Sequence, residues 1–320
     1  MLQIDAERTK ALLPWRPLVE AIRDTFRTGC EMPAKHEHFI EVPDEPAGKL
    51  LLMPAWTVGG YIAVKVANVF PGNAARGQLA VNAAVLLLDG QTGEVLALID
   101  GGEVTARRTA ASSALAADYL ARADSSHLVV LGTGRLGGDN LVEAHAAVRP
   151  IRRVTIWGRN PDKAKAAAAD IAQKGLEASA TEDLATAVSE TDIVSTATIA
   201  QEPVLHGAWL SPGTHVDLVG NYSATSREAD DDVVRRATLF IDTQAALKAT
   251  GDIAVPLASG VIAESDIAGD FYDLTRGAHP GRCDPEEITA FKSCGAAAED
   301  LAAAKLVYEL GCAETRSGSR

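Results

Sequence analysis

The stretch HLVVLGTGRLG, residues 127–137, constrains the fold more than any other part of the sequence. An apolar run typical of a buried strand leads directly into GTGRLG, and a helical pattern follows. In such a unit Gly132 permits the tight turn, Gly134 lets the backbone approach a pyrophosphate, and Gly137 allows close packing of the helix on the strand. The N-terminus of the helix then offers free N–H groups to the phosphates. The stretch therefore predicts a dinucleotide-binding site.

The residues around this site have the organisation of a doubly wound domain. Short apolar runs alternate with alanine-rich segments, of which residues 139–148 and 161–174 have helical spacing. The apolar runs are residues 127–132, 154–158, 192–198, 214–220 and 238–243. Runs rich in β-branched residues that alternate with helices indicate a parallel sheet covered on both faces. We therefore expect an α/β fold with a Rossmann-type doubly wound parallel sheet.

The beginning of the chain reads differently and predicts a second, α+β domain. Four strand-like runs are separated by turn signals of hairpin length, which favours an antiparallel or mixed sheet. These runs are residues 50–56, 62–70, 79–89 and 94–100. A long helix at 105–123 joins the two domains, and a helix at 296–311, closed by Gly311 as its C-cap, is expected to return to the first domain. The predicted domains are residues 1–122, completed by residues 296–320, and residues 123–295.

The composition excludes several classes of partner. The chain has 30 Lys and Arg against 43 Asp and Glu, a net charge of −13, whereas nucleic-acid-binding proteins concentrate positive charge. No apolar run approaches the roughly 20 residues that span a bilayer, and MLQIDAERTK at the start is unlike a secretory signal. The four cysteines lack a CxxC pair, which suits reduced thiols. We expect a soluble cytoplasmic protein that binds neither nucleic acid nor membrane.

The end of the second strand, WGRNP, bears on the choice of cofactor. An NAD site places an acid there for the ribose 2′-hydroxyl, whereas an arginine suits a 2′-phosphate. Arg159 fills this place, and no acid precedes Asp162. Because a guanidinium pairs strongly with an anion, NADP(H) is favoured over NAD(H), with a solvated surface arginine as the alternative. The candidate cofactor-binding residues are Gly132, Gly134, Arg135, Leu136, Gly137, Arg159, Asn160, Thr198, Val219, Gly220 and Ser293.

Several cations in the first domain are candidates for binding an anionic ligand. Lys65 interrupts an apolar strand, where a lysine is expensive to bury unless it meets an anion. Arg107 and Arg108 stand in the first turn of the long helix, where cations oppose the helix dipole. The two lie about 100° apart around the helix, so we expect only one to face the site. Lys35 is a third cation on a predicted strand, and surface charge remains an alternative for each.

Other polar groups are interpreted as structural. His36 and His38 share a strand face, but no third ligand has a recognisable spacing, so we predict no metal site. The Glu299–Asp300 pair is interpreted as a solvated or capping feature of the last helix. No Ser-His-Asp or reactive-cysteine arrangement stands out.

Five motifs in order along the chain resemble the ornithine cyclodeaminase/mu-crystallin family, over about residues 33–308. They are VKVANVFPGNAARG, TGEVLALIDGGEVTARRTAA, GTGRLG, IWGRNP and FKSCGAAAEDLAAA. The resemblance implies a homodimer whose first domain and last helix form the dimer and substrate half. It also implies that Lys65 is the active-site lysine, that Arg108 binds the substrate carboxylate, and that Lys35 replaces the family's usual arginine.

The turn after the strand ending in VG separates the branches of this family. In cyclodeaminases it carries a proton-handling aspartate, whereas here Asn221 and Tyr222 occupy it, with Glu37 or Asp217 as possible substitutes. The resemblance therefore implies NADPH-dependent reduction of a small cyclic ketimine carboxylate, Δ1-pyrroline-2-carboxylate and/or Δ1-piperideine-2-carboxylate, to L-proline or L-pipecolate. The alternatives are an NAD-dependent ornithine cyclodeaminase, a mu-crystallin-like ligand-binding protein and an alanine-dehydrogenase-like reductive aminase.

Overall fold

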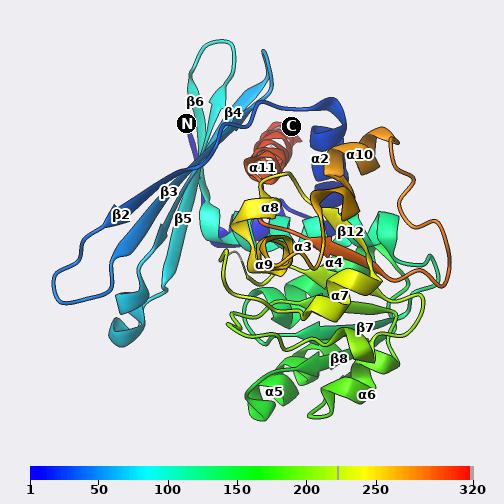
Figure 1. The fold of residues 1–320 in the computed structure, drawn as a ribbon. Helices are drawn as coiled ribbons and strands as arrows, with labels where there is room; N and C mark the ends of the chain where they lie inside the picture. The colour runs from blue at the N-terminus through cyan, green and yellow to red at the C-terminus, as the bar shows by residue number, and fades with distance from the viewer. Residues whose placement is uncertain (222, 318–320) are drawn as a thin grey trace. The chain divides into compact units, whose positions relative to one another are not determined.

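The computed structural model describes residues 1–221 and 223–317 and divides into two compact units (Figure 1). Unit 1 comprises Met1–Arg108 and Ala296–Arg320, and unit 2 comprises Thr109–Gly295. The division falls inside helix α3 (Gly101–Leu120), whereas the sequence places it after residue 122. A single continuous helix therefore belongs in part to each unit.

Unit 1 is built on a six-stranded mixed sheet in the order β1-β6-β5-β4-β3-β2. β1 runs parallel to β6, and all other neighbours are antiparallel. The strands are β1 (Leu2–Ile4), β2 (His36–Ile40), β3 (Gly48–Trp56), β4 (Tyr61–Val69), β5 (Val81–Asp89) and β6 (Val95–Asp100). The antiparallel or mixed sheet predicted from the hairpin-length turns is confirmed.

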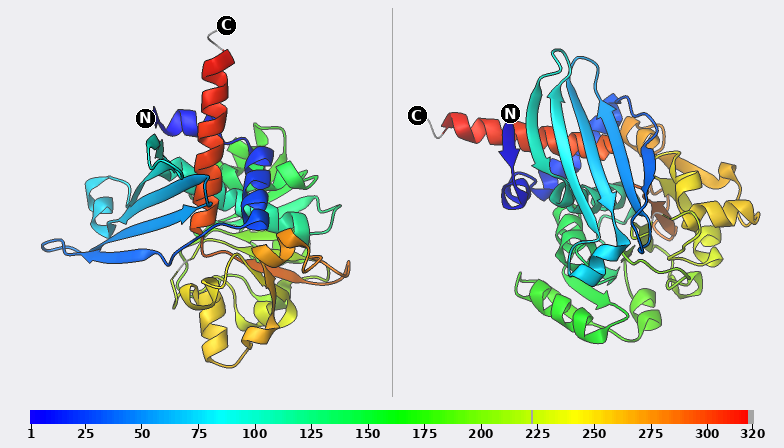
Figure 2. Two further views of the ribbon diagram at one scale, coloured as in Figure 1. Left: turned by 90° about the horizontal axis from the view of Figure 1, so that it is seen from above. Right: turned by 90° about the vertical axis from the view of Figure 1, so that its left-hand side faces the viewer.

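Helix α11 (Ala297–Ser317) crosses one face of this sheet and contacts β3 to β6 (Figure 2). On β4, alternate residues Ala63, Lys65 and Ala67 are buried while their neighbours are only half-buried, which is the period-2 pattern of a strand with one face covered. The other helical segments of unit 1 are α1 (Ala6–Ala11), α2 (Trp15–Thr28) and the 3₁₀ segment η1 (Pro71–Arg76).

The last helix does not end at Gly311, so that prediction is wrong. α11 continues to Ser317, and a Cβ at Gly311 would lie 3.5 Å from a methyl group of Leu12. One turn further on, Glu314 forms an ion pair with Arg8 of α1. Packing against the N-terminal segment therefore stabilises a turn that a glycine would otherwise end.

Unit 2 contains an eight-stranded parallel sheet in the order β13-β12-β14-β11-β10-β7-β8-β9, which confirms the doubly wound prediction. Its strands are β7 (His127–Leu131), β8 (Arg153–Trp157), β9 (Glu177–Ala180), β10 (Ile193–Thr196), β11 (His215–Leu218), β12 (Thr238–Ile241), β13 (Ile267–Asp270) and β14 (Thr289–Lys292). Its helical segments after α3 are η2 (Leu136–Asn140), α4 (Leu141–Val148), α5 (Pro161–Ala172), α6 (Leu184–Ser189), η3 (Gly207–Trp209), α7 (Asp231–Arg236), α8 (Ala246–Ala249), α9 (Gly251–Ala258), η4 (Glu264–Asp266) and α10 (Phe271–Arg276).

The strand order of unit 2 reverses between β7 and β10, where chain connections leave in opposite directions. In open parallel sheets ligands bind at such a switch point, beyond the carboxyl ends of the strands. Leu131 at the end of β7 pairs with Trp157 on one side and Thr196 on the other. The loops after these three strands therefore position the candidate site. Within the described chain, none of the helices has the length and apolar character of a membrane span.

The interior of unit 2 contains a polar pair that no solvent reaches. His145 and Asp217 are fully buried, with Nε2 3.9 Å from Oδ2. Burial lowers the pKa of His145 from 6.5 to about 4 and raises the pKa of Asp217 from 3.8 to about 6. The contribution of His145 to stability is complete above pH 6.5 and is lost as the pH falls towards 4. That of Asp217 is complete below pH 3.8 and is lost as the pH rises through 6.

Between about pH 4 and 6 these two effects oppose each other, and single substitutions should separate them. In Asp217→Asn the remaining histidine should make the free energy of unfolding rise with pH relative to the wild type, by up to about 1.4 kcal/mol per pH unit. His145→Gln should give the opposite slope. Urea denaturation at several pH values in this range measures both. If the free energy of unfolding of both variants changed with pH as it does in the wild type, the pKa shifts assigned to His145 and Asp217 would be contradicted.

Candidate functional site

The glycine-rich turn after β7 has the geometry that a bound dinucleotide needs. Gly132 has a φ of +134°, and a Cβ there would lie 2.5 Å from the carbonyl oxygen of Ala197. A Cβ at Gly137 would lie 2.5 Å from the carbonyl oxygen of Gly132, so neither position tolerates a side chain. A Cβ at Gly134 would meet nothing within 4 Å, which leaves the backbone there open to a ligand.

A cavity of about 330 Å³ opens beside this turn, at the ends of β7, β8 and β10. Five of the predicted cofactor-binding residues line it: Gly132, Gly134, Arg159, Asn160 and Thr198. Thr133, Trp157, Lys163 and Ile199 also contribute to the lining. The switch point of the sheet, the glycine-rich turn and a cavity therefore coincide, as a dinucleotide site requires.

The charge of this cavity favours an anion. Among the described residues that line it, Arg159 and Lys163 are charged and none is acidic. The side chain of Asn160 accepts hydrogen bonds from the backbone N–H groups of Asp162 (3.0 Å) and Lys163 (3.1 Å), and so caps α5. This cap fixes the turn that carries both cations. The sequence analysis missed Lys163, although its place four residues after Arg159 in the first turn of a helix was a usable signal.

The remaining predicted cofactor residues do not line the cavity. Gly137 lies beneath the turn, and the carbonyl of Arg135 accepts a hydrogen bond of 2.7 Å from the Asn140 amide. Ser293 is buried, and its hydroxyl donates to Asp242 at 3.1 Å. Leu136 begins η2, and Val219 and Gly220 directly follow β11. These residues therefore shape the surroundings of the cavity.

The turn after β11 uses Asn221 for its own structure. The Asn221 amide donates to the carbonyl of Ala200 at 2.8 Å, and its oxygen accepts from the N–H of Ser223 at 3.0 Å. The side chain is 8% exposed and cannot titrate. Tyr222, the other residue that the sequence places at this turn, lies outside the described residues. The amide of Asn221 thus connects the two strand-end loops.

Two of the predicted cations of unit 1, Lys65 and Arg108, meet Glu299 and Asp300 in a buried cluster of four side chains. Lys65 Nζ lies 2.9 Å and 2.8 Å from the two carboxylate oxygens of Asp300. Arg108 Nε lies 3.1 Å from Asp300 Oδ1, and its Nη1 lies 2.5 Å from Glu299 Oε2. The interpretation of the two acids as a solvated or capping pair is therefore wrong: both are fully buried. The sequence contained one signal for them, since a buried lysine requires an anion.

The surroundings of Lys65 in this buried cluster lower its pKa towards neutral pH. Burial, and next the charge of Arg108, lower the pKa of Lys65 to about 8, against the opposing effect of Asp300. The two cations and two carboxylates sum to zero charge. A lysine with this pKa is protonated at neutral pH and can release the proton at little cost, which suits a general acid.

The two neighbouring arginines of α3 serve different contacts. Arg108 enters the buried cluster, whereas Arg107 Nε donates to the carbonyl of Leu13 at 2.9 Å. The Arg107 guanidinium also stacks 3.8 Å from the centre of the Trp15 ring. Arg107 therefore attaches the N-terminal segment to α3, and only Arg108 faces the cluster.

Lys35 lies just before β2 and is exposed. His36 of β2 pairs with Leu52, whereas the bridge of Glu31 with Trp56 differs from that register by one residue, so the chain is irregular around Lys35. Lys35 therefore lies outside the buried cluster.

The two acids that the sequence offered as substitutes for the missing aspartate have other partners. Glu37 forms an ion pair with Lys49 of β3. Asp217 lies in the interior of unit 2 and accepts a hydrogen bond of 2.7 Å from the Ser195 hydroxyl. Within the described part of the chain, neither belongs to the lining of the 330 Å³ cavity.

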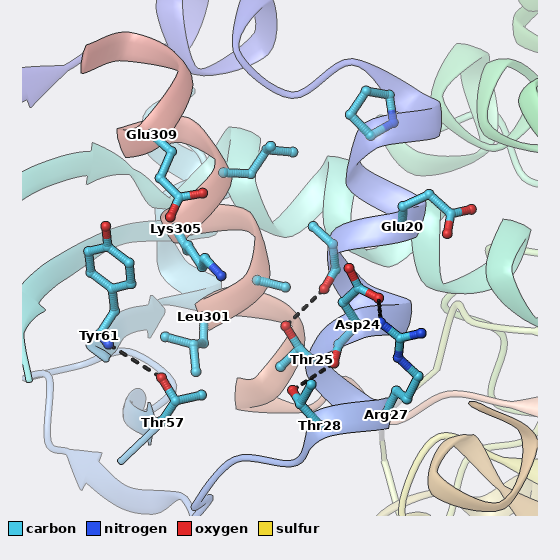
Figure 3. A pocket seen from close by; sticks show the side chains of 14 residues that line it. Glu20, Asp24, Thr25, Arg27, Thr28, Thr57, Tyr61, Leu301, Lys305 and Glu309 are labelled. Atoms are coloured by element: carbon cyan, nitrogen blue, oxygen red, sulfur yellow. Dashed lines mark hydrogen bonds and ion pairs between the residues drawn. The ribbon is translucent and has the colours of Figure 1, made fainter. Parts of the chain in front are cut away.

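A larger cavity of unit 1, about 400 Å³, lies between α2, α11 and the turn from β3 to β4 (Figure 3). Its lining includes Glu20, Asp24, Lys305 and Glu309, with none of the four members of the buried cluster among the described residues. Its size alone does not identify it as the chemical site, because the residues predicted from the sequence lie elsewhere.

Comparison with known proteins agrees with this reading of the fold. Residues 4–314 match the Ornithine cyclodeaminase/mu-crystallin family. A Δ1-pyrroline-2-carboxylate reductase of Paracoccus denitrificans is 41% identical over 301 residues, which are 92% of each chain. The solved structure of Thermococcus litoralis Δ1-pyrroline-2-carboxylate reductase, in complex with NADH and L-proline, has a TM-score of 0.90 at 34% identity and covers 98% of both chains. An archaeal alanine dehydrogenase dimer with bound NAD has a TM-score of 0.89 at 30% identity, over 98% of this chain and 97% of that one.

The fold and the site thus define a dinucleotide-binding protein of the Rossmann type, with a second α+β unit that holds a buried cluster of two cations and two carboxylates. The chain belongs to the ornithine cyclodeaminase/mu-crystallin family, as the order of its motifs indicated.

Proposed function

We propose that the protein is an oxidoreductase that reduces a cyclic ketimine carboxylate, Δ1-pyrroline-2-carboxylate and/or Δ1-piperideine-2-carboxylate, to L-proline or L-pipecolate with NADPH. The observation that carries the proposal is the buried Lys65–Arg108 pair, in a chain that is 41% identical to a protein named Δ1-pyrroline-2-carboxylate reductase. The Thermococcus litoralis structure with NADH and L-proline supports the same reaction class.

The charge balance of the buried cluster supports this substrate class. A cyclic imine carboxylate that takes up one proton at nitrogen from Lys65 becomes a zwitterion without net charge, so the negative charge of its carboxylate is balanced within the site. Arg108, with Lys35 as the second cation that the family resemblance implies, is assigned to the carboxylate. Lys65 is assigned to hold the proton for the imine nitrogen, directly or through water. When bound, the nicotinamide cofactor supplies the hydride for the C=N carbon.

The turn after β11 supports a reductase over an ornithine cyclodeaminase. Cyclodeamination moves protons between two amines and the ring-closing carbon, and Asn221 cannot titrate. The buried, ion-paired Lys65 and Arg108 also argue against a protein that only binds a ligand. Reductive amination of a 2-oxo acid remains the second candidate, because the archaeal alanine dehydrogenase has nearly the same fold.

The preference for NADP(H) over NAD(H) is part of the proposal, and the charge of the cavity supports it. Arg159 and Lys163 both line the cavity, at the end of the strand where a ribose 2′-substituent is read. The two solved relatives named above were determined with NADH and NAD, so the proposed preference differs from the cofactors in those structures and rests on Arg159 and Lys163.

A homodimer is likewise proposed, and the second face of the unit 1 sheet supports it (Figure 2). Pro54, Val64, Leu86 and Leu98 stand directly opposite one another across four strands and are half-buried. Covering a continuous apolar row of this kind with a second copy of the chain would be favourable.

A cytoplasmic location is also proposed. The four cysteines form no disulfide with one another, which suits a reducing compartment.

The function is tested by steady-state kinetics with purified protein. NADPH oxidation should be rapid with either or both cyclic imines and slower by at least tenfold with pyruvate plus ammonia. L-Ornithine with NAD⁺ should release no ammonia at a comparable kcat. Ammonia release as fast as imine reduction would replace the proposal with the lyase, and faster turnover of pyruvate would replace it with the reductive aminase.

The pH dependence of imine reduction should report the protonation of Lys65. We expect kcat/KM to fall as the pH rises through about 8, because Lys65 must carry the proton. Asp300→Asn removes the carboxylate that raises this pKa, so the falling limb should move down by about one pH unit or more. Glu309→Gln, an exposed change on the same helix, should leave the limb in place. A limb unmoved by Asp300→Asn would assign the titration to another group.

The two cavity cations should discriminate between cofactors. Arg159→Ala and Lys163→Ala should each weaken NADPH binding about fivefold to tenfold, since each removes a charge-assisted contact worth about 1 kcal/mol at an exposed position. NADH binding should change less than twofold. Lys165→Ala, an exposed lysine outside the cavity lining, is the control. Calorimetric titration without substrate gives the dissociation constants, and equal wild-type affinity for the two cofactors would overturn the preference.

A further inference from the structure

One buried carboxylate, that of Glu228, joins the two loops that follow β10 and β11. Glu228 Oε1 accepts hydrogen bonds from the N–H of Thr198 at 2.7 Å and from its hydroxyl at 2.9 Å. Glu228 Oε2 accepts from the N–H groups of Gly220 at 2.8 Å and Asn221 at 3.1 Å. A single fully buried side chain thus satisfies donors from both loops at the edge of the sheet where a ligand binds.

This carboxylate is itself held by a buried ionic network. Lys292 Nζ lies 4.0 Å from Glu228, 2.9 Å from Asp252, and donates to the carbonyl of Asn221 at 2.7 Å. The Asp252 carboxylate accepts from the backbone N–H groups of Glu228 at 2.7 Å and Ala229 at 3.1 Å. Since an unpaired buried charge is strongly destabilising, this network fixes Glu228 in one position.

The two loops touch at the point where Glu228 binds them. A Cβ at Gly220 would lie 2.2 Å from the backbone nitrogen of Thr198, so the loops are already at contact distance. Thr198 lines the 330 Å³ cavity, whereas Glu228 is absent from its described lining. A change in the spacing of the loops therefore moves a wall of the cavity without removing a group that touches a ligand.

We propose that Glu228 is a positioning residue of the dinucleotide site, which sets the spacing of the loops after β10 and β11 and so holds Thr198 in the cavity wall. The inference rests on the assignment of this cavity to a dinucleotide and is independent of the substrate. The backbone N–H groups of Thr198, Gly220 and Asn221 point to the protein's own carboxylate, so they do not serve the phosphates. The glycine-rich turn keeps that role.

Two chemically different variants test the proposal. Glu228→Gln keeps the size of the side chain but turns an amide N–H₂ towards backbone or hydroxyl donors, which opens one side of the clamp. Gly220→Ala leaves the charge in place and forces the loops apart sterically. Both should raise the dissociation constant for NADPH at least tenfold. Glu202→Gln, which changes an exposed acid in the loop after β10, is the matched control and should change the dissociation constant less than twofold.

The readout is NADPH binding without substrate, followed by calorimetry or by the fluorescence of Trp157, which lines the cavity. Each variant is measured at a temperature where its circular dichroism spectrum matches that of the wild type. A general loss of stability then does not affect the dissociation constant. Hydrogen exchange at the amides of residues 198, 220 and 221 should also quicken in Glu228→Gln. Weaker NADPH binding in both variants, together with faster hydrogen exchange, supports the role of Glu228 in holding the two loops together. Binding within twofold of the wild type in either folded variant overturns it, whatever the result of the catalytic assays.

Discussion

The ion pairs between Lys65, Arg108 and the two acids of α11 determine how unit 1 is assembled. Each of these side chains is almost fully buried, and removing one member of a buried ion pair costs about 3–5 kcal/mol because its partner is left uncompensated. Loss of any one of the four side chains would therefore weaken the packing of α11 on the sheet. They also keep a lysine and an arginine side by side, an arrangement that repulsion would otherwise oppose. The proposed site for an anionic substrate group depends on this balance.

Unit 2 also contains a buried group of ion pairs, but there the ion pairs hold loops in place. Glu228, Asp252 and Lys292 are buried together and fix the backbone of two loops, whereas the cluster of unit 1 fixes cationic side chains. In both places the ions are satisfied within the protein, so the site geometry exists before any ligand arrives. Preorganisation of this kind reduces the ordering that binding must supply. Arg159 and Lys163 differ, because both are exposed. They are better suited to discriminating between cofactors than to fixing the position of one.

Features that depend on residues close together in the sequence could be predicted, and contacts between residues far apart in the sequence could not. The parallel sheet and the glycine-rich turn could be predicted because strand runs, helical spacing and glycine positions are local patterns. The need for a counter-ion near Lys65 could also be inferred, but its identity could not, since Asp300 is 235 residues away. The end of α11 was mispredicted because contacts with α1 outweigh the local preference of Gly311. The use of Asn221 as a link between loops likewise depends on a carbonyl 21 residues away.

The discontinuity of unit 1 has a consequence for biosynthesis. Arg108 meets Asp300 across 192 residues of intervening chain, almost all of it unit 2. At translation rates of roughly 5–20 residues per second, the two cations wait on the order of 10–40 s for their counter-ions. During that interval the nascent sheet lacks both the helix that covers it and the charges that allow its lysine to be buried. Unit 2 is complete in sequence before then and can fold first. Docking of the last helix is therefore the final step, and a ribosome that stops early releases a chain with a complete unit 2 and an incomplete unit 1.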